Sequence, residues 1–330
     1  MKKVVVLGGD GVFGNHTVAR TLADPAVEQV VSIGRNVRKH DAFSLGIGNS
    51  DPRFQYRQIH IVFEHDRLIE ALDDIKPDTI INFAAQGEGA ASWKYSWRYF
   101  ETNATAIARI CEDLMKRDYL ERWIQISSSE IYGSVKEPIT EEGAIQPTSP
   151  YAASKAAGDM YLLSISKTQD FPVILVRPSN AYGPGQQLHR IVPRAALFGL
   201  MGQKLPLHGG GEVLKSYLYT TDLAEGIHLV TLRGKPGGVY NIGPDDPVKI
   251  KKIVELVAAE LDMPFDDLVD ITDPRFGEDK VYWLDSSLVK NELGWAPSVD
   301  LKEGVAHTVK WARENLDYLR RQNSTFEFKA

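Results

Sequence analysis

The chain has 330 residues, of which 43% are hydrophobic and 25% charged, a composition typical of an ordinary globular protein with a large core. The net charge of −6, with no block of Lys or Arg, argues against nucleic acid or an anionic membrane as the main partner. The single cysteine, Cys111, excludes an internal disulfide and fits a reducing compartment, so we predict a cytoplasmic protein. No stretch approaches the ~20 apolar residues of a membrane-spanning helix. The histidines show no HExxH or Cys/His spacing, so we predict no metal.

The chain opens with a β-branched strand, a glycine turn and a helical pattern. Gly8, Gly11 and Gly14 form the spacing GxxGxxG directly after the strand. A dinucleotide site needs a tight turn there, close approach of the backbone to a pyrophosphate, and a glycine where helix meets sheet. The context of strand, turn and helix therefore predicts a dinucleotide site at these glycines, together with Val12 and Phe13. The alternative is a glycine-rich turn without a ligand.

A second strand is predicted at Gln29–Ile33. In dinucleotide-binding folds the end of this strand carries an acid that accepts a hydrogen bond from the 2′-hydroxyl of NAD. Here Gly34 is followed by Arg35 and Asn36, so the acid is missing and a guanidinium is present. This pattern favours NADP, with NAD as the second choice. The alternative is that Arg35 stacks on adenine or faces solvent.

The chain from residue 40 to residue 86 contains a loop, a helix and a strand. Residues 40–66 show no alternation clear enough to fix a strand, and a helix follows over about Asp66–Asp74. The next strand, Thr79–Gln86, ends in small residues that allow a cofactor to lie close to the backbone. The residues we assign to the cofactor here are Ala84, Ala85 and Gln86.

A polar and aromatic segment, GEGAASWKYSW, follows this strand. Because it falls at the carboxyl end of a strand, Glu88 and Ser92 could face a substrate. The alternative is a surface loop whose Trp93, Tyr95 and Trp97 pack at a subunit contact.

Hydroxyl and carboxylate side chains follow the next predicted strand, the apolar run Trp123–Ile126. Ser128, Ser129 and Glu130 come directly after it. The carboxyl ends of strands are where open α/β sheets bind ligands. We therefore expect these three side chains at the catalytic site.

Tyr151 and Lys155 stand four residues apart after Pro150. If this segment is helical, both side chains lie on one face. An ammonium there can lower the pKa of the phenol towards neutrality and leave the Tyr able to exchange a proton. A hydroxyl donor, a carboxylate and a Tyr/Lys pair would then converge.

The remaining pattern alternates helices with apolar strands. A helix over Ala104–Tyr119 and a strand over Phe171–Pro178 predict an α/β fold with a doubly wound parallel sheet, a Rossmann domain. Beyond residue 178 the pattern changes, and we expect a smaller mixed α/β domain for the substrate. The predicted boundaries are 1–178 for the nucleotide-binding domain, with 222–243 returning to it, and 179–330 for the substrate domain. The other predicted elements are a helix at 193–201, a hairpin-like passage that leads into a helix over 205–227, a strand at 239–242, and helices at 249–261, 285–293 and 300–320.

Seven motifs carry a resemblance that covers the chain almost end to end. They are GGDGVFG, NFAAQ, SSSEIYG, PYAASK, VRPSNAYGPGQ, LKSYLYTTDLA and DPRFGEDKVYWLDSSLVKNELGW. In these the chain resembles the extended short-chain dehydrogenase/reductase family, the nucleotide-sugar epimerases and dehydratases. The resemblance implies a larger NAD(P)-binding lobe, a smaller lobe that holds a nucleotide-diphospho-sugar substrate, and a homodimer formed through the helices containing 98–117 and 151–168.

The resemblance also implies roles for individual residues. Ser128 would bond the 4-hydroxyl or 4-keto oxygen of the sugar, Tyr151 would remove the hydroxyl proton, and Lys155 would bind the nicotinamide ribose and tune Tyr151. The resemblance also implies that Asn103 and Arg177 bind the cofactor. The residues that it implies at the substrate are Asn180, Arg190, Lys215 and Arg275.

The reaction depends on the pair Ser129 and Glu130. The dTDP-glucose 4,6-dehydratases have Thr-Asp-Glu here, whereas GDP-mannose 4,6-dehydratases and UDP-glucuronate decarboxylases resemble this chain with Thr-Ser-Glu. Simple 4-epimerases usually lack an acid at this place, and the alternative for Glu130 is a carboxylate that only binds a hydroxyl. We predict a nucleotide-sugar 4,6-dehydratase, with 4-epimerase or decarboxylase as alternatives and a non-catalytic NADP-sensing regulator as the alternative of another class.

Two departures from the family pattern indicate an uncommon sugar or nucleotide. Lys215 stands where an Arg usually meets the diphosphate, and an ammonium lacks the bidentate fork of a guanidinium. Gly87 and Glu88 replace the usual Ser-His after the fourth strand.

Overall fold

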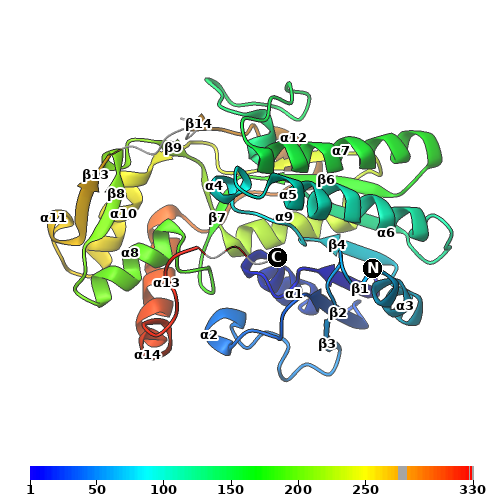
Figure 1. The fold of residues 1–330 in the computed structure, drawn as a ribbon, viewed down its shortest axis with the longest axis horizontal. Helices are drawn as coiled ribbons and strands as arrows, with labels where there is room; N and C mark the ends of the chain where they lie inside the picture. Colours follow the sequence, from blue (N-terminus) through cyan, green and yellow to red (C-terminus); the bar gives the residue numbers. More distant parts are fainter. Residues whose placement is uncertain (274–280, 327, 329–330) are drawn as a thin grey trace.

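The structure, a computed structural model, describes residues 1–273, 281–326 and 328. Its centre is a seven-stranded parallel sheet with the order β11-β6-β5-β4-β1-β2-β3, of which Figure 1 labels β6, β4, β1, β2 and β3. The strands are β1 Lys3–Leu7, β2 Gln29–Gly34, β3 Phe54–Gln58, β4 Thr79–Asn82, β5 Arg122–Ile126, β6 Val173–Pro178 and β11 Val239–Ile242. The chain order reverses between β1 and β4, which is where open α/β sheets form a crevice for ligands.

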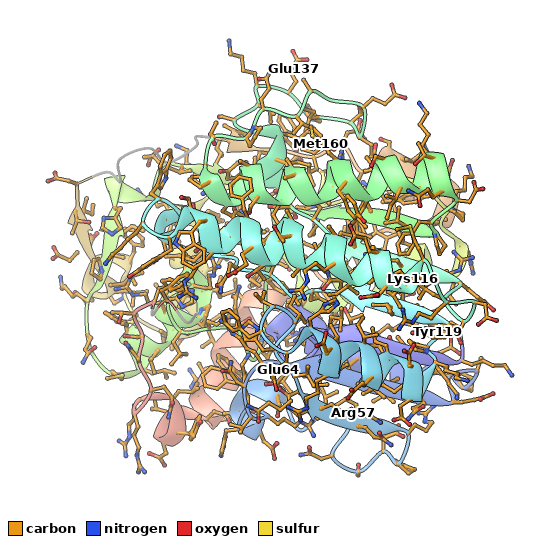
Figure 2. All side chains as sticks on the ribbon, turned by 45° about the vertical axis from the view of Figure 1, so that its right-hand side comes forward. Arg57, Glu64, Lys116, Tyr119, Glu137 and Met160 are labelled. Atoms are coloured by element: carbon orange, nitrogen blue, oxygen red, sulfur yellow. The ribbon has the colours of Figure 1, made fainter. Side chains whose placement is uncertain are left out.

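Helices cover both faces of the sheet, which explains the continuous apolar runs of its central strands. On one face the core joins the sheet to α3 His65–Ile75, α6 Ala106–Leu114 and α7 Pro150–Gln169, which lie in front of the sheet in Figure 2. On the other face it joins the sheet to α1 Val12–Leu22, α9 Thr220–Arg233 and α12 Ser287–Leu293. The predicted doubly wound α/β sheet is therefore confirmed.

The helix predicted at Ala104–Tyr119 has a different form in the structure. The short helix α5, Ser96–Phe100, runs into a π-helical turn η1, Glu101–Thr105, and then into α6, which ends at Leu114. Such turns are rare and often occur at functional sites. The turn contains Asn103, whose buried side chain bonds the main chain that follows β4.

A smaller lobe holds a separate core of its own. It contains three small sheets: β10 Tyr217–Tyr219 with β7 Asn180–Tyr182, β9 Leu214–Lys215 between β12 Val248–Lys249 and β14 Val281–Tyr282, and β8 Leu205–His208 with β13 Val269–Thr272. Its helices are α8 Ile191–Leu200, α10 Ile250–Glu260, α11 Phe265–Leu268, α13 Leu301–Glu314 and α14 Leu316–Leu319.

The prediction of a hairpin-like passage in this lobe is wrong. β8 and β9 do not pair with each other, because β8 pairs in parallel with β13 and β9 pairs with β12 and β14. Strand segments of two to four residues receive their partners from distant parts of the chain. Local turn signals therefore gave the wrong partner.

The chain returns to the large sheet late in the sequence. Strand β11 pairs in parallel with β6 at the edge of the sheet, and α9 packs against α1. The division of the chain at residue 178 remains a prediction. Short elements complete the fold: α2 Asp41–Ser44, α4 Gly89–Ser92, η2 Ser129–Tyr132 and η3 Gly209–Gly211. Within the described residues, no helix combines the length and apolarity needed to cross a bilayer.

Candidate functional site

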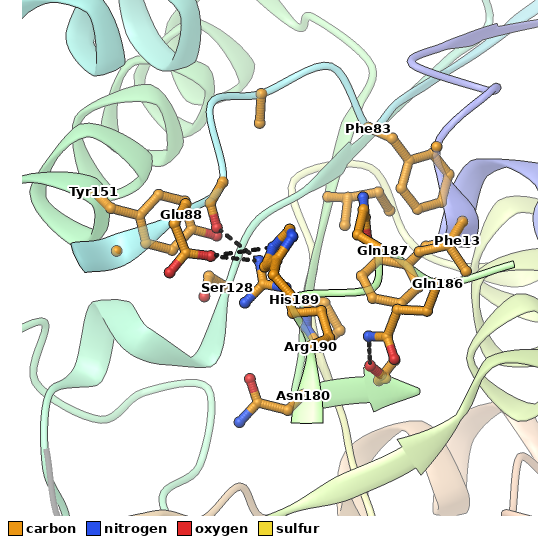
Figure 3. A pocket seen from close by; sticks show the side chains of 18 of the residues that line it. Phe13, Phe83, Glu88, Ser128, Tyr151, Asn180, Gln186, Gln187, His189 and Arg190 are labelled. Atoms are coloured by element: carbon orange, nitrogen blue, oxygen red, sulfur yellow. Dashed lines mark hydrogen bonds and ion pairs between the residues drawn. The ribbon is translucent and has the colours of Figure 1, made fainter. Parts of the chain in front are cut away.

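A cavity of about 770 Å³ runs along the carboxyl ends of the central strands and is bounded on its far side by the smaller lobe. Figure 3 shows part of its lining, where side chains from the loop after β4, from the N-cap of η2, from α7 and from the segment before α8 point towards one another. A cavity of this volume is in the range of small-molecule and cofactor sites. It is built from both lobes, so each lobe can hold a different part of a ligand.

The glycine turn after β1 forms one end of the cavity. Gly8 has φ +75°, and a Cβ there would lie 2.8 Å from the backbone nitrogen of Ala84. A Cβ on Gly14 would lie 2.6 Å from the carbonyl oxygen of Gly8. Both glycines are therefore needed for close backbone packing, and Gly11 is the N-cap of α1. The turn presents the N-terminus of α1 to the cavity, which fits the diphosphate of a dinucleotide.

Basic side chains lie where β2 ends. A Cβ on Gly34 would lie 2.8 Å from the hydroxyl of Tyr56, so a carboxylate side chain at this position would require Tyr56 to move. Arg35 lines the cavity, and burial lowers the pKa of its guanidinium. Lys39 lines the same region, and its ammonium donates to the carbonyl oxygen of Asp10 at 2.7 Å. The end of β2 thus presents cationic groups to a ligand.

The end of β5 delivers the Ser/Glu cluster. Ser128 is the N-cap of η2, and its Oγ accepts a hydrogen bond from the backbone N–H of Glu130 at 3.1 Å. All three residues of the predicted set, Ser128, Ser129 and Glu130, line the cavity. The short helix therefore fixes the direction of the cluster by its own capping bond.

Tyr151 and Lys155 lie on the first turns of α7, as predicted. The helix begins at Pro150 because Ser149 caps it, with its Oγ accepting from the N–H of Ala152 at 3.1 Å. Both side chains line the cavity, where Lys155 is buried and Tyr151 is partly buried. The spacing of four residues therefore puts the phenol and the ammonium in the same cavity.

The electrostatics of the pair differ from the expectation. Burial, followed by the negative charge of Glu130, raises the pKa of the Tyr151 phenol, and a hydrogen bond with Ser128 opposes this shift. Burial lowers the pKa of Lys155 to about 8, and its Nζ donates to the carbonyl oxygen of Ile126 at 2.6 Å. The expectation that Lys155 lowers the phenol pKa towards neutrality is therefore wrong for the protein alone. Burial and the Glu130 carboxylate raise the phenol pKa, and the Lys155 ammonium is engaged by the carbonyl oxygen of Ile126.

The ion pair of Glu88 and Arg190 lies next to Tyr151, on the side of the smaller lobe. Arg190 Nη2 lies 3.1 Å from Glu88 Oε2, and His189 Nε2 lies 3.6 Å from the same oxygen (Figure 3). The charge of Arg190 lowers the pKa of the Tyr151 phenol, and the charge of Glu88 raises it. Further along the cavity, the ammonium of Lys215 lies 5.0 Å from the centre of the Tyr282 ring.

Most of the predicted site residues line this one cavity. The predicted residues that line it are Gly8, Gly11, Val12, Phe13, Gly14, Arg35, Asn36, Ala84, Ala85, Glu88, Ser128, Ser129, Glu130, Tyr151, Lys155, Asn180, Arg190 and Lys215. Arg275 falls outside the described residues. The structure therefore brings together side chains that are up to about two hundred positions apart in the sequence.

Four predicted residues do not line the cavity: Gln86, Ser92, Asn103 and Arg177. Gln86 and Asn103 lie behind its wall and support it. Asn103 exchanges hydrogen bonds with the backbone of Gln86 at 2.9 and 3.0 Å and donates to Ser154 at 2.9 Å. Through these bonds Asn103 joins Gln86, in the loop after β4, to Ser154 on α7. Ser92 is buried, and its hydroxyl donates to the carbonyl oxygen of Gly89 at 2.6 Å, so it closes the turn of α4 and does not face a substrate.

Arg177 is the fourth. Its buried guanidinium pairs with Asp159 at 3.3 Å and donates to the hydroxyl of Tyr132 at 2.7 Å. The prediction that Arg177 binds the cofactor is corrected accordingly, because its donors join α7 and η2 to the sheet. A buried cation needs a buried partner, and Asp159 cannot be identified as that partner from spacing alone.

Sequence reasoning missed His189, Lys39 and Tyr56, which all line the cavity. His189 directly precedes the predicted Arg190, and Lys39 closes the run Arg35–Lys39, so position in a motif could have identified both. Tyr56 lies in a stretch whose weak alternation hid the strand β3. No motif marks it.

Comparisons with known proteins agree with this site. The model of the NAD dependent epimerase/dehydratase family matches residues 4–243. A dTDP-glucose 4,6-dehydratase of Actinoplanes sp. is 32% identical over 324 residues, which cover 95% of this chain and 98% of the relative. The crystal structure of the dTDP-glucose 4,6-dehydratase DesIV from Streptomyces venezuelae, with NAD bound, has a TM-score of 0.88 at 29% identity and covers 96% of this chain and 98% of that one.

A UDP-glucose 4-epimerase from Thermotoga maritima is also similar, with a TM-score of 0.86 at 25% identity over 95% of this chain and 99% of that one. Dehydratases and epimerases therefore share this fold. The match of the family model, the dehydratase relative and the Ser/Tyr/Lys geometry lead to one conclusion: the chain belongs to the NAD-dependent epimerase/dehydratase family of nucleotide-sugar enzymes.

Proposed function

We propose that the protein is a nucleotide-diphospho-sugar 4,6-dehydratase that acts by transient oxidation at C4. The observation that carries the proposal is the position of Glu130. Its carboxylate lies in the same cavity as Tyr151 and close enough for its charge to raise the pKa of the phenol. An epimerase needs only the Tyr and the rotation of the keto sugar, whereas elimination needs a base for the proton at C5.

Tyr151 is the group that accepts the proton of the 4-hydroxyl. Its phenolate must form in a buried site, where the charge of Glu130 opposes it. Lys155, whose ammonium bonds the Ile126 carbonyl in the protein alone, can turn to the phenolate or to a ribose hydroxyl. A bound nicotinamide would add a positive charge here, accept a hydride and later return it. Ser128 would hold the oxygen at C4 by a hydrogen bond.

Glu130 acts after the oxidation. A carbonyl at C4 makes the proton at C5 acidic, and Glu130 removes that proton as the bond from C6 to its hydroxyl oxygen breaks. A double bond then joins C5 and C6. Return of the hydride to C6 and of a proton to C5 gives a 4-keto-6-deoxy sugar, so the cofactor undergoes no net change.

We assign NADP as the preferred cofactor. The glycine turn of β1 fits a dinucleotide, and the end of β2 presents Arg35 and Lys39 to the cavity. Tyr56 packs over Gly34 and occupies the space that an acidic side chain would need to meet a 2′-hydroxyl. A 2′-phosphate would accept a charge-assisted hydrogen bond from the partly buried guanidinium of Arg35.

The smaller lobe would hold the nucleoside diphosphate, with Lys215, Asn180 and Arg190 on the walls of the cavity. We also propose a homodimer through the helices that contain residues 98–117 and 151–168. Phe100 is 39% exposed and Met160 56% exposed on this face, and Met160 projects from α7 in Figure 2. Exposed apolar side chains on adjacent helices are typical of subunit contacts.

The test is product analysis on a panel of nucleotide-diphospho-hexoses and nucleotide-diphospho-hexuronates. We expect a 4-keto-6-deoxy product from one hexose, detected by mass spectrometry as loss of one water. A product of unchanged mass would indicate an epimerase, and loss of carbon dioxide a decarboxylase. No turnover on any sugar, with cofactor bound, would favour a regulator.

A further inference from the structure

The elimination at C6 requires an acid as well as a base, because a hydroxyl group leaves as water only after it receives a proton. Ser129 stands at the place of the acid in the dehydratases with Thr-Asp-Glu, and a serine hydroxyl is a poor acid. Among the described residues that line the cavity, the carboxylates are Asp10, Glu88 and Glu130. Asp10 lies at the glycine turn beside Lys39, and Glu130 is occupied as the base.

Glu88 lies beside the reacting groups. A Cβ on Gly89 would lie 3.6 Å from Oε2 of Glu130, so the backbone next to Glu88 runs along the catalytic carboxylate. The carbonyl oxygen of Glu88 accepts a hydrogen bond from Tyr99 at 2.7 Å, and the ring of Tyr99 meets the ring of Tyr151 edge-on at 6.3 Å. These contacts place the loop after β4 against both proposed catalytic residues.

The carboxylate of Glu88 is engaged in an ion pair with the guanidinium of Arg190, so we look beyond Glu88 for the proton donor. Arg190 Nη2 lies 3.1 Å from Glu88 Oε2 and also donates to the carbonyl oxygen of Gly87 at 3.3 Å. The imidazole of His189 is the second basic group beside this carboxylate, and histidine is the side chain that serves most often as a general acid or base. Its Nε2 lies 3.6 Å from the Glu88 carboxylate, so Nδ1 is the nitrogen not directed at Glu88.

The ring of His189 is held on a second side. Phe326 meets it edge-on, with ring centres 5.3 Å apart and an angle of 75° between the planes. A carboxylate on one nitrogen and an aromatic ring at its edge restrict the orientation of the imidazole, as an ionised partner does for the general bases and acids of other enzymes. His189 also lines the cavity, with 19% of its side chain exposed.

We propose that His189, oriented by Glu88, is the general acid that protonates the oxygen leaving C6. This inference rests on the proposed function. In the step, the bond from C6 to its oxygen breaks, a proton passes from the imidazolium to that oxygen, and water leaves. Glu130 takes the proton from C5, and the electron pair of the C5–H bond forms the C5–C6 double bond. His189 is thus a catalytic residue, and Glu88 is a positioning residue.

The test compares two leaving groups at C6. The hydroxyl of the natural substrate needs a proton, whereas fluoride in a 6-deoxy-6-fluoro analogue leaves without one. We expect His189→Gln to slow elimination of water by about 10²–10⁴-fold, the usual value of one proton-transfer group. We expect the same variant to eliminate fluoride within about tenfold of the wild-type rate. Glu88→Gln should change the two rates in the same pattern but less.

The matched control is His307→Gln. His307 forms a His/Glu contact with Glu303 on the exposed side of α13 and does not line the cavity, so both rates should equal those of the wild type. Equal losses of water and fluoride in His189→Gln would mean that His189 only binds the sugar, and the inference would be overturned. An unchanged rate of water loss would overturn it as well. If the wild type dehydrates no sugar but binds cofactor, the proposed function fails first and the acid assignment falls with it.

Discussion

Removal of the guanidinium at the end of β2 should change the cofactor preference. Arg35 lines the cavity, and burial lowers the pKa of its guanidinium, so the cation gains free energy when an anion approaches it. A hydrogen bond to a charged partner contributes about 1.5–3 kcal/mol. That corresponds to roughly ten- to a hundred-fold in affinity. We therefore expect Arg35→Ala to weaken NADP binding by this factor and to leave NAD binding nearly unchanged.

The assay is calorimetric titration of protein stripped of nucleotide, with NADP and NAD measured separately. Chromatography of the nucleotide released when the purified protein is denatured shows which cofactor it selects in the cell. The matched control is Arg57→Ala, because Arg57 lies on the neighbouring strand β3, pairs with Asp74 at 2.8 Å and does not line the cavity (Figure 2). Release of NAD alone, or an equal loss of both affinities in Arg35→Ala, would refute the reasoning.

Three further predictions concern Tyr151, Glu130 and Lys155. Tyr151→Phe should lower turnover by at least about 10²–10⁴-fold while cofactor affinity measured by titration is kept; near-normal turnover would remove Tyr151 from the mechanism. Glu130→Gln should still oxidise C4, so rapid-quench samples should contain keto sugar and reduced cofactor; a normal product at a normal rate would contradict the role as base. Lys155 has a folded pKa of about 8 against 10.5 when unfolded, so the unfolded chain binds more protons between these values and stability should rise with pH there. Denaturant unfolding should show the stability of the wild type rising relative to Lys155→Met from pH 8 to about pH 10; a constant difference would contradict a buried Lys155.

The sequence predicted the large sheet well because its signals are local. Strands β1 and β6 contain continuous apolar runs, and the glycine turn after β1 has a steric requirement that can be read from spacing alone. The strand at Val239–Ile242 and the helix that begins after Asp300 were likewise predicted from the sequence pattern. The small sheets were not predictable, because β8 meets β13 only after about sixty residues of chain.

The residues of the candidate site could also be predicted only in part. Residues in motifs, such as Ser128, Tyr151 and Lys155, meet in one cavity as expected. Arg177 does not line the cavity, because it pairs with the buried Asp159 of α7. The sequence alone does not show that this side of α7 faces Arg177. The raised pKa of Tyr151 also depends on burial and on the Glu130 charge, and both are properties of the assembled cavity.

The central claim is that hydride leaves C4 and returns to C6 after Glu130 has removed the proton at C5. The most direct measurement uses a nucleotide-sugar substrate with deuterium at C4, followed by NMR of the product. The account predicts deuterium at C6 of a 4-keto-6-deoxy sugar. Deuterium returned to C4, in a sugar that keeps its 6-hydroxyl, would contradict dehydration and show that the enzyme is an epimerase.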